Sequence, residues 1–208
     1  MIPDNPFLSA PDEGVTRLIL VRHAQTEANA KHYLQGQSDG ALNESGLAQA
    51  ARIAEHLRPF YIGKIYSSNK RRALTTAAAI AKEHGLEVQV DPRLQEWNVG
   101  EWDGMPAPDF KRMIAEQGLT ASTFNPPGGE TFQQVRERAG VVLTDILSQS
   151  EGKSVLITSH GDFIRSMIGV LMGIETDVVT NFLLDNASYS ILEKQQGTWK
   201  ILTLNRIS

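Results

Sequence analysis

Short apolar segments rich in branched residues alternate with longer segments whose apolar residues recur at helical spacing, and this alternation constrains the fold most strongly. The predicted strands are residues 16–21 (TRLILV), 64–67 (KIYS) and 154–158 (SVLIT). The predicted helices are residues 47–57, about 69–84, 131–146 and the segment that follows 158 and ends near 173. Strands that alternate with helices predict an α/β fold, a three-layer sandwich with a mostly parallel central sheet and helices on both faces.

Other segments complete this outline. Residues 88–90 predict a third, short strand in the middle of the chain, and residues 187–193 and 199–205 predict a closing hairpin that turns at 196–197. In the first helix, we expect Leu47 to share a buried face with Ala50, Ala54 and Leu57. Prolines and glycines break the pattern from residue 98 to 129, which predicts a lid or binding loop with one short helix near 110–117.

Length and charge limit the classes of protein to consider. A chain of 208 residues fits one domain, which we place at residues 16–208 after an irregular arm at 1–15. The chain has no cysteine, which excludes disulfides and thiolate sites. A net charge of −4 gives no reason to expect binding to nucleic acid or to an anionic membrane. No stretch reaches the ~20 apolar residues of a membrane span, so we expect a cytoplasmic protein, with a homo-oligomer left open.

Polar residues follow three of the predicted strands, either directly or within a few residues. Arg22 and His23 follow the first strand, an arginine pair at 71–72 lies shortly after the second, and His160 follows the third long strand. Because ligands of open α/β sheets bind beyond the carboxyl ends of the strands, these side chains should meet at one edge. Arginine binds phosphate oxygens as a fork, and an imidazole nitrogen in such a site can attack phosphorus. The residues alone therefore predict an anion site with histidines nearby.

Six ordered blocks resemble the histidine phosphatase superfamily, which includes the phosphoglycerate mutases. The blocks are LVRHAQTEAN (20–29), QGQSDGALNESGLAQA (35–50), YSSNKRRALTTA (66–77), LQEWNVGEWDG (94–104), PPGGET (126–131) and SHGDFIR (159–165). They cover most of the chain from residue 17 to about 170. The resemblance implies the phosphoglycerate mutase-like form of the α/β sandwich.

The resemblance also implies a role for each matching residue. His23 matches the nucleophile that becomes phosphorylated, and Glu96 matches the proton donor to the leaving oxygen. Arg22 and Arg72 match the phosphate-binding pair, and His160 matches the second histidine of the pocket. The substrate-lining positions match Asn29, Gln35 and Gly36. From the blocks we predict a metal-independent phosphomonoester hydrolase without a cofactor, acting on a small phosphorylated metabolite.

Two alternatives remain. A phosphoglycerate mutase would typically have arginine where Trp97 stands, and a longer insertion before PPGG, so both departures favour a phosphatase. A catalytically silent relative that binds phosphorylated partners is less compatible with the presence of both His23 and Glu96. Ala24 replaces the glycine of the best-known motif, which we expect to matter little. Lys111 and Arg112 could meet a second anionic group of the substrate, or both could simply face solvent, and Phe110, Met113 and Phe124 are candidate apolar walls.

Overall fold

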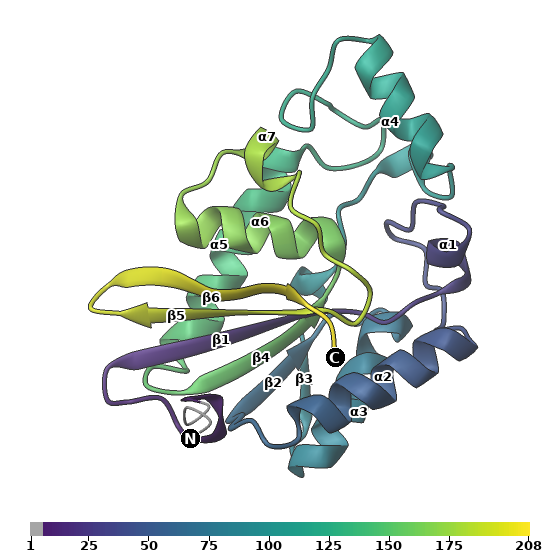
Figure 1. The fold of residues 1–208 in the computed structure, drawn as a ribbon. Coiled ribbons are helices and arrows are strands. Elements are labelled where there is room, and N and C mark those ends of the chain that lie inside the picture. The colour runs from purple at the N-terminus through teal and green to yellow at the C-terminus, as the bar shows by residue number, and fades with distance from the viewer. Residues whose placement is uncertain (1–5) are drawn as a thin grey trace.

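The computed structural model describes residues 6–208 and contains one six-stranded mixed sheet (Figure 1). Its strands are β1 (Val15–Arg22), β2 (Lys64–Ser67), β3 (Val88–Val90), β4 (Ser154–Ser159), β5 (Tyr189–Gln195) and β6 (Thr198–Arg206). They are ordered β3-β2-β4-β1-β5-β6. The first four in this order pair in parallel, whereas β5 and β6 add an antiparallel edge. The predicted α/β class, the mostly parallel sheet and the closing hairpin are confirmed.

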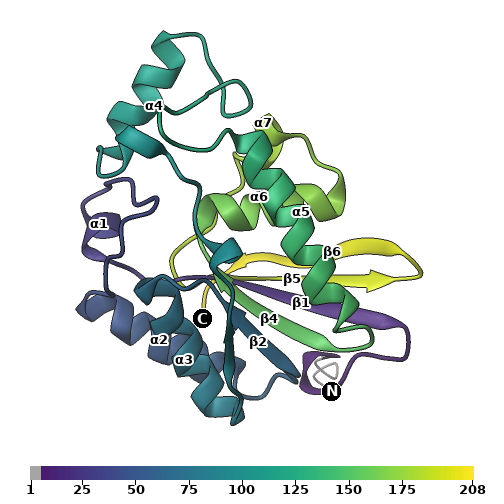
Figure 2. The same cartoon turned by 180° about the vertical axis from the view of Figure 1, so that it is seen from behind.

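Helices cover both faces of the sheet, as Figures 1 and 2 show from opposite sides. The α-helices are α1 (Glu27–Ala30), α2 (Glu44–Leu57), α3 (Arg71–His84), α4 (Ala107–Glu116), α5 (Phe132–Ser148), α6 (Gly161–Met172) and α7 (Thr176–Val179). Short 3₁₀ helices occupy Pro6–Leu8, Pro92–Leu94 and Gly100–Trp102. One layer consists of α2 and α3, and the opposite layer of α5 and α6. The three-layer sandwich is therefore also confirmed.

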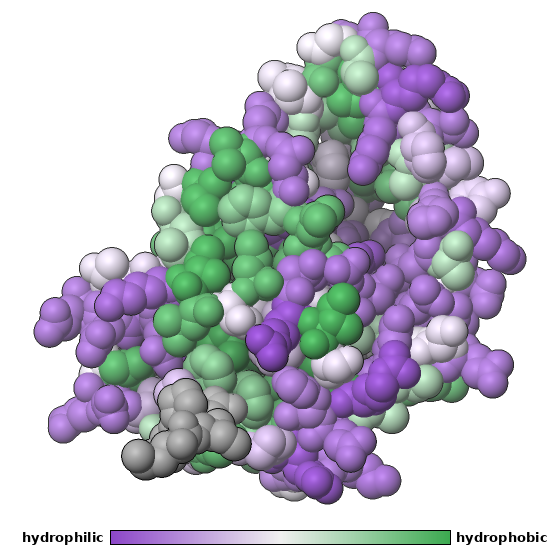
Figure 3. Space-filling view, viewed as in Figure 1, coloured by the Kyte–Doolittle hydropathy of each residue, from purple (hydrophilic) through white to green (hydrophobic). Residues whose placement is uncertain are grey.

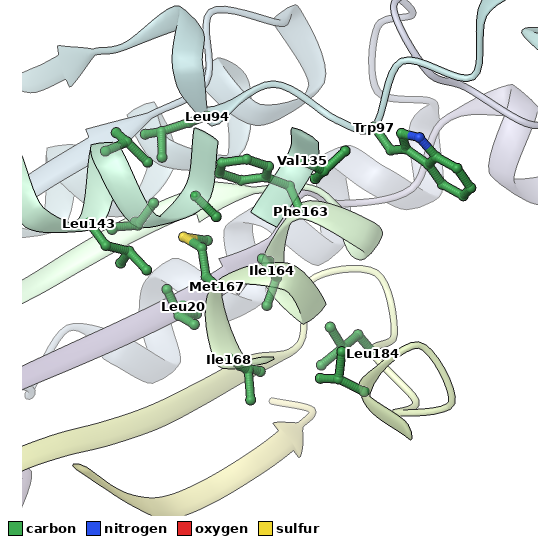
Figure 4. Close-up of a cluster of buried hydrophobic side chains, with 14 of the residues drawn as sticks. Leu20, Leu94, Trp97, Val135, Leu143, Phe163, Ile164, Met167, Ile168 and Leu184 are labelled. Carbon is green, nitrogen blue, oxygen red and sulfur yellow. The ribbon is translucent and has the colours of Figure 1, made fainter. Parts of the chain in front are cut away.

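The alternation of side chains along β1 explains the two layers. Leu18 and Leu20 point into the cluster with α5 and α6, whereas Ile19 and Val21 belong to the cluster with α2 and α3. Figure 4 shows the first of these clusters, in which Leu20 lies near side chains of both helices. A strand that is apolar on both faces can be buried only between two layers, so the continuous apolar run fixes β1 at the centre of the sheet.

Several element boundaries differ from the predictions. β1 begins at Val15, one residue earlier than expected, and α4 begins three residues before 110. In α2, Leu47 is 54% exposed, so its assignment to the buried face was wrong. The buried face continues through Ala50, Ile53, Ala54 and Leu57 instead. Leu47 lies in the first turn of the helix.

The segment from 98 to 129 forms the part of the molecule that carries α4 and stands above the carboxyl edge of the parallel strands (Figure 1). Its glycines allow close contact with the loop that precedes α5. Gly100 has a φ of +57°, and a Cβ on it would lie 1.9 Å from the carbonyl oxygen of Pro127. This position therefore requires glycine, and the contact fixes the base of the segment beside the sheet edge.

Candidate active site

The carboxyl ends of β1, β4 and β2 bring three predicted site residues together. Arg22 ends β1, and the next amide, that of His23, donates to the Ser159 carbonyl oxygen at the end of β4 (2.9 Å). The Ser68 amide, just after β2, donates to Thr158 O at 3.1 Å. The imidazole rings of His23 and His160 lie 5.1 Å apart between their centroids. Parallel pairing therefore places the two histidines in one site, as the strand-end argument predicted.

His23 has a hydrogen bond that fixes which ring nitrogen can react. Its Nδ1 lies 2.8 Å from the carbonyl oxygen of Ala24, which can only accept, so Nδ1 carries the proton and Nε2 holds a free lone pair. Burial lowers the pKa of His23 well below its ordinary value, and the nearby Arg22 and Arg72 lower this pKa further. The imidazole is therefore neutral over a wide pH range, as a nitrogen nucleophile must be.

His160 is held by a different arrangement. Arg72 donates from Nε to Nδ1 of His160 at 3.1 Å, so Nδ1 is unprotonated and Nε2 can donate to the hydroxyl of Ser68 at 2.9 Å. Burial and the positive charge of Arg72 lower the pKa of His160 well below its ordinary value. Ser68, just after β2, thus orients this ring.

Arg72 and Arg22 differ in how many of their donors are already used. Arg72 is fully buried and also donates to the carbonyl oxygens of residues 35, 36 and 38. Arg22 donates from Nη1 to the carbonyl oxygen of Leu184 at 2.6 Å, whereas its buried Nε has no hydrogen-bond partner among residues 6–208. A buried guanidinium nitrogen without a partner is costly unless a ligand supplies an acceptor. Arg22 therefore offers the clearest open donor for an anion.

Glu96 lies in the loop after the 3₁₀ helix Pro92–Leu94, and its carboxyl group contacts the start of α6. Its Oε1 accepts hydrogen bonds from the amides of Trp97 (2.9 Å) and Phe163 (3.0 Å), and its Oε2 accepts from the amide of Asp162 (3.3 Å). Burial raises the pKa of Glu96 and the Asp162 carboxylate raises it further, while the Trp97 amide and the two site arginines oppose this shift. The amides of the first turn of α6 thus hold the carboxyl group of Glu96.

Arg138 of α5 supports the chain on which Glu96 lies. Its guanidinium donates to the carbonyl oxygens of Arg93 and Gln95 at 2.8 Å and of Glu96 at 3.3 Å. It is paired with Glu130 at 2.7 Å and lies 4.4 Å from the centre of the Phe163 ring. Sequence reasoning missed Arg138, because only the fold brings α5 against this loop.

The predicted lining residues Asn29, Gln35 and Gly36 also lie at the site. Asn29 Oδ1 accepts from the amide of Asn186 at 3.1 Å, and Asn186 also donates to the carbonyl oxygen of His23. The Asn29 Nδ2 group has no partner among the described residues and is left as a donor. Gln35 Oε1 accepts from the Thr26 hydroxyl at 2.8 Å. Asn186 was not identified from the sequence, since no motif surrounds it.

A cavity of about 580 Å³ joins most of these groups. The predicted residues that line it are Arg22, His23, Asn29, Gln35, Gly36 and Glu96. Further lining residues include His32, Lys111, Asp162, Arg165, Leu183, Asp185 and Asn186. Arg72 and His160 are fully buried. Phosphate is much smaller than this volume, so the cavity has room for the rest of an ester.

Of the two expected aromatic walls, Phe124 was assigned wrongly because it lines no cavity here, whereas Phe110 lines a smaller cavity beneath α4 that adjoins this one. Phe110 and Phe124 are buried and pack edge-to-face against Trp97, with ring centroids 6.2 Å from that of the indole. They support the cavity from behind, since Trp97 itself lines it. Trp97 also stacks edge-to-face on Phe132 and donates from Nε1 to the carbonyl oxygen of Glu130. The aromatic residues thus form a core under α4 that fixes the loop after Glu96.

Within residues 6–208, no three His, Cys, Asp or Glu side chains gather in a way that could hold a metal ion. No helix in the same range is long and apolar enough to cross a membrane.

Comparison with known proteins gave consistent matches along nearly the whole chain. The model of the histidine phosphatase superfamily (branch 1) matches residues 18–207. Phosphoserine phosphatase 1 of Hydrogenobacter thermophilus is 33% identical over 199 residues, which cover 92% of each chain. A probable phosphoglycerate mutase of Enterobacter sp. is 31% identical over 189 residues, covering 88% of this chain and 87% of the relative.

A solved structure agrees with these matches. The mycobacterial glucosyl-3-phosphoglycerate phosphatase, in complex with VO3, superposes with a TM-score of 0.80 and 31% identity. The superposition covers 91% of this chain and 98% of the other.

Proposed function

Because this chain belongs to the histidine phosphatase superfamily, we propose that it hydrolyses a small phosphate monoester through a phosphorylated His23, without a metal ion. The observation that carries the proposal is the hydrogen bond from Nδ1 of His23 to the carbonyl oxygen of Ala24, which leaves Nε2 as the nucleophile. His23 lines the same cavity as Arg22 and Glu96, which supply an open donor and a buried acid.

In the first step, the ester phosphate binds to Arg22 Nε and Asn29 Nδ2, with the positive charge of Arg72 beside it. Nε2 of His23 attacks phosphorus, and a P–N bond forms as the ester P–O bond breaks. Glu96 gives its proton to the departing oxygen, so the alcohol leaves neutral. The arginines stabilise the charge on the transferring group.

In the second step, water replaces the alcohol. The ionised Glu96 takes a proton from this water, whose oxygen attacks the phosphohistidine. A P–O bond forms, the P–N bond breaks, and inorganic phosphate leaves. His23 returns as the neutral imidazole and Glu96 as the acid, so the cycle consumes only the ester and water.

The named substrates of the relatives support a substrate class. Phosphoserine and the phosphoglycerates are phosphate esters whose alcohol part carries a carboxylate. A cavity of about 580 Å³ holds esters of this size. We therefore extend the proposal to phosphorylated small carboxylic acids.

A phosphoglycerate mutase is the second candidate, because a relative of 31% identity has that name. It would pass phosphate from phosphohistidine to a second sugar acid. Trp97 argues for water as the acceptor, since its ring is packed against Phe132 in the core and adds no positive charge to the cavity.

The test measures phosphate release from a panel of phosphomonoesters in the presence of chelator. We expect wild-type turnover with chelator and almost none in His23→Ala. Full activity of His23→Ala, or a strict need for a divalent metal, would refute the proposal. A coupled mutase assay primed with 2,3-bisphosphoglycerate should give no turnover, and faster transfer than hydrolysis would establish the mutase instead.

A further inference from the structure

The catalytic cavity continues into a second cavity of about 380 Å³ beneath α4. Both cavities share six lining residues, which are Leu34, Trp97, Ala107, Lys111, Asp162 and Arg165. In Figure 3 the surface is hollowed between the part that carries α4, at the top, and the body of the molecule. The second cavity is otherwise lined mainly by apolar side chains such as Phe110, Ile114 and Leu119. Charged side chains, namely Lys111, Asp162 and Arg165, therefore lie at the junction where the two cavities share residues, and apolar side chains line the second cavity beyond it.

Lys111 is the cation at this junction that lacks a protein partner. It is exposed, and within residues 6–208 it makes no hydrogen bond or ion pair. Its neighbour Arg112 faces differently, because it pairs with Asp109 at 2.8 Å and with Glu116 at 3.9 Å and lines neither cavity. The two cations of α4 are thus separated into one that borders the cavity and one that is neutralised on the outer surface.

The other charges around the cavity are already partnered or catalytic. Arg165 donates to Asp162 at 2.9 Å and to the carbonyl oxygen of Phe182 at 2.8 Å. A Cβ on Gly161 would lie 3.3 Å from Arg165 and 3.5 Å from Arg22, so these two guanidinium groups both lie beside Gly161. Asp162 is therefore neutralised by Arg165 rather than by Lys111. This leaves Lys111 as the one lysine or arginine on the described cavity wall that is free for an anionic group away from the phosphate.

We propose that Lys111 determines specificity by binding the carboxylate of the substrate while Arg22 holds its phosphate. The proposal rests on the proposed function, since it concerns the alcohol part of the same ester. An ammonium group pairs well with a carboxylate, and its flexible stem suits esters that differ in length. The apolar cavity beyond Lys111 accommodates larger alcohol parts that extend under α4.

The test compares two esters that differ only in the carboxylate, O-phosphoserine and O-phosphoethanolamine. The two share the phosphate, the chain and the amine, so effects of Asp162 or Asp185 on the amine cancel in the ratio of their kcat/KM values. We expect the wild type to prefer O-phosphoserine, and Lys111→Met to reduce that preference by about three- to ten-fold, mainly through KM. The matched control Arg112→Met should keep the wild-type ratio, and thermal unfolding should show that both variants are folded.

The possible results separate the two proposals. An unchanged ratio in Lys111→Met, an equal drop in Arg112→Met, or no wild-type preference would each overturn the role of Lys111 while hydrolysis through His23 stands. If the wild type hydrolyses neither ester and His23 is never phosphorylated, the proposed function fails and the role of Lys111 fails with it.

Discussion

Replacing Glu96 by glutamine removes the proposed acid with little change of shape. The glutamine oxygen can still accept from the amides of Trp97 and Phe163, which bind Oε1 at 2.9 and 3.0 Å. The amide nitrogen then faces the amide of Asp162, so one weak 3.3 Å contact is lost. That loss costs about 1 kcal/mol. We therefore expect Glu96→Gln to fold and to bind inorganic phosphate almost as the wild type does.

The size of the catalytic effect should depend on the leaving group. The alcohol of O-phosphoserine leaves as an unstable alkoxide unless it is protonated, so kcat/KM for this ester should fall by ~10²–10⁴-fold. The anion of p-nitrophenol is stable without protonation, so kcat/KM for p-nitrophenyl phosphate should fall far less. The second step still needs Glu96 as a base, so p-nitrophenyl phosphate should give one rapid equivalent of p-nitrophenol and then slow turnover.

Steady-state and rapid-quench assays of both esters measure this difference, and phosphate binding to the variant provides the control. An equal loss of kcat/KM with both esters would refute the assignment of Glu96 as the acid.

Stability gives an independent check, because burial and Asp162 raise the pKa of Glu96 in the folded protein. The free energy of unfolding therefore decreases as pH rises from the ordinary pKa through the raised one. As pH rises through this range, the Tm of Glu96→Gln should therefore increase relative to that of the wild type.

Three further substitutions test the surroundings of the site. Asp162→Asn should move the falling limb of the kcat/KM–pH profile to lower pH, because the Asp162 carboxylate raises the pKa of Glu96, whereas Asp185→Asn on the same cavity should leave it in place. An upward shift in Asp162→Asn would contradict this reasoning. Arg138→Met should lower Tm by about 5–10 °C, measured by calorimetry, because it breaks a largely buried ion pair and frees three carbonyl oxygens. Arg72→Ala should reduce kcat/KM by about 10²–10³-fold. A loss no larger than that of a surface arginine-to-alanine control would show that the charge of Arg72 is not used.

The layers of the fold could be predicted because β1 is apolar on both faces and therefore needs a covering layer on each side. Leu18 and Leu20 need one covering layer and Ile19 and Val21 another, so this strand had to be central. The exposure of Leu47 could not be predicted, because helical spacing identifies a face of the helix but not which residues of that face another element covers.

The site shows the same division between local and long-range information. The positions of His23 and His160 follow from parallel strands that end at one edge, which a sequence can indicate. Arg138 and Asn186 could not be found in this way, since each acts on a segment more than forty residues distant in the chain. Lys111 lines the cavity and Arg112 does not, because of the rotation of α4 about its axis. This rotation could not be predicted from the sequence, since the segments that flank α4 are irregular.

Phosphorylation of His23 can be measured directly in Glu96→Gln, where the second step is slow. The variant is mixed with p-nitrophenyl phosphate, denatured under alkaline conditions in which phosphohistidine survives, and analysed by mass spectrometry after digestion. We predict one added phosphoryl group on the peptide that contains His23, and none when His23→Ala is combined with the first substitution. Release of p-nitrophenol without this adduct, or with phosphate on another residue, would contradict the mechanism.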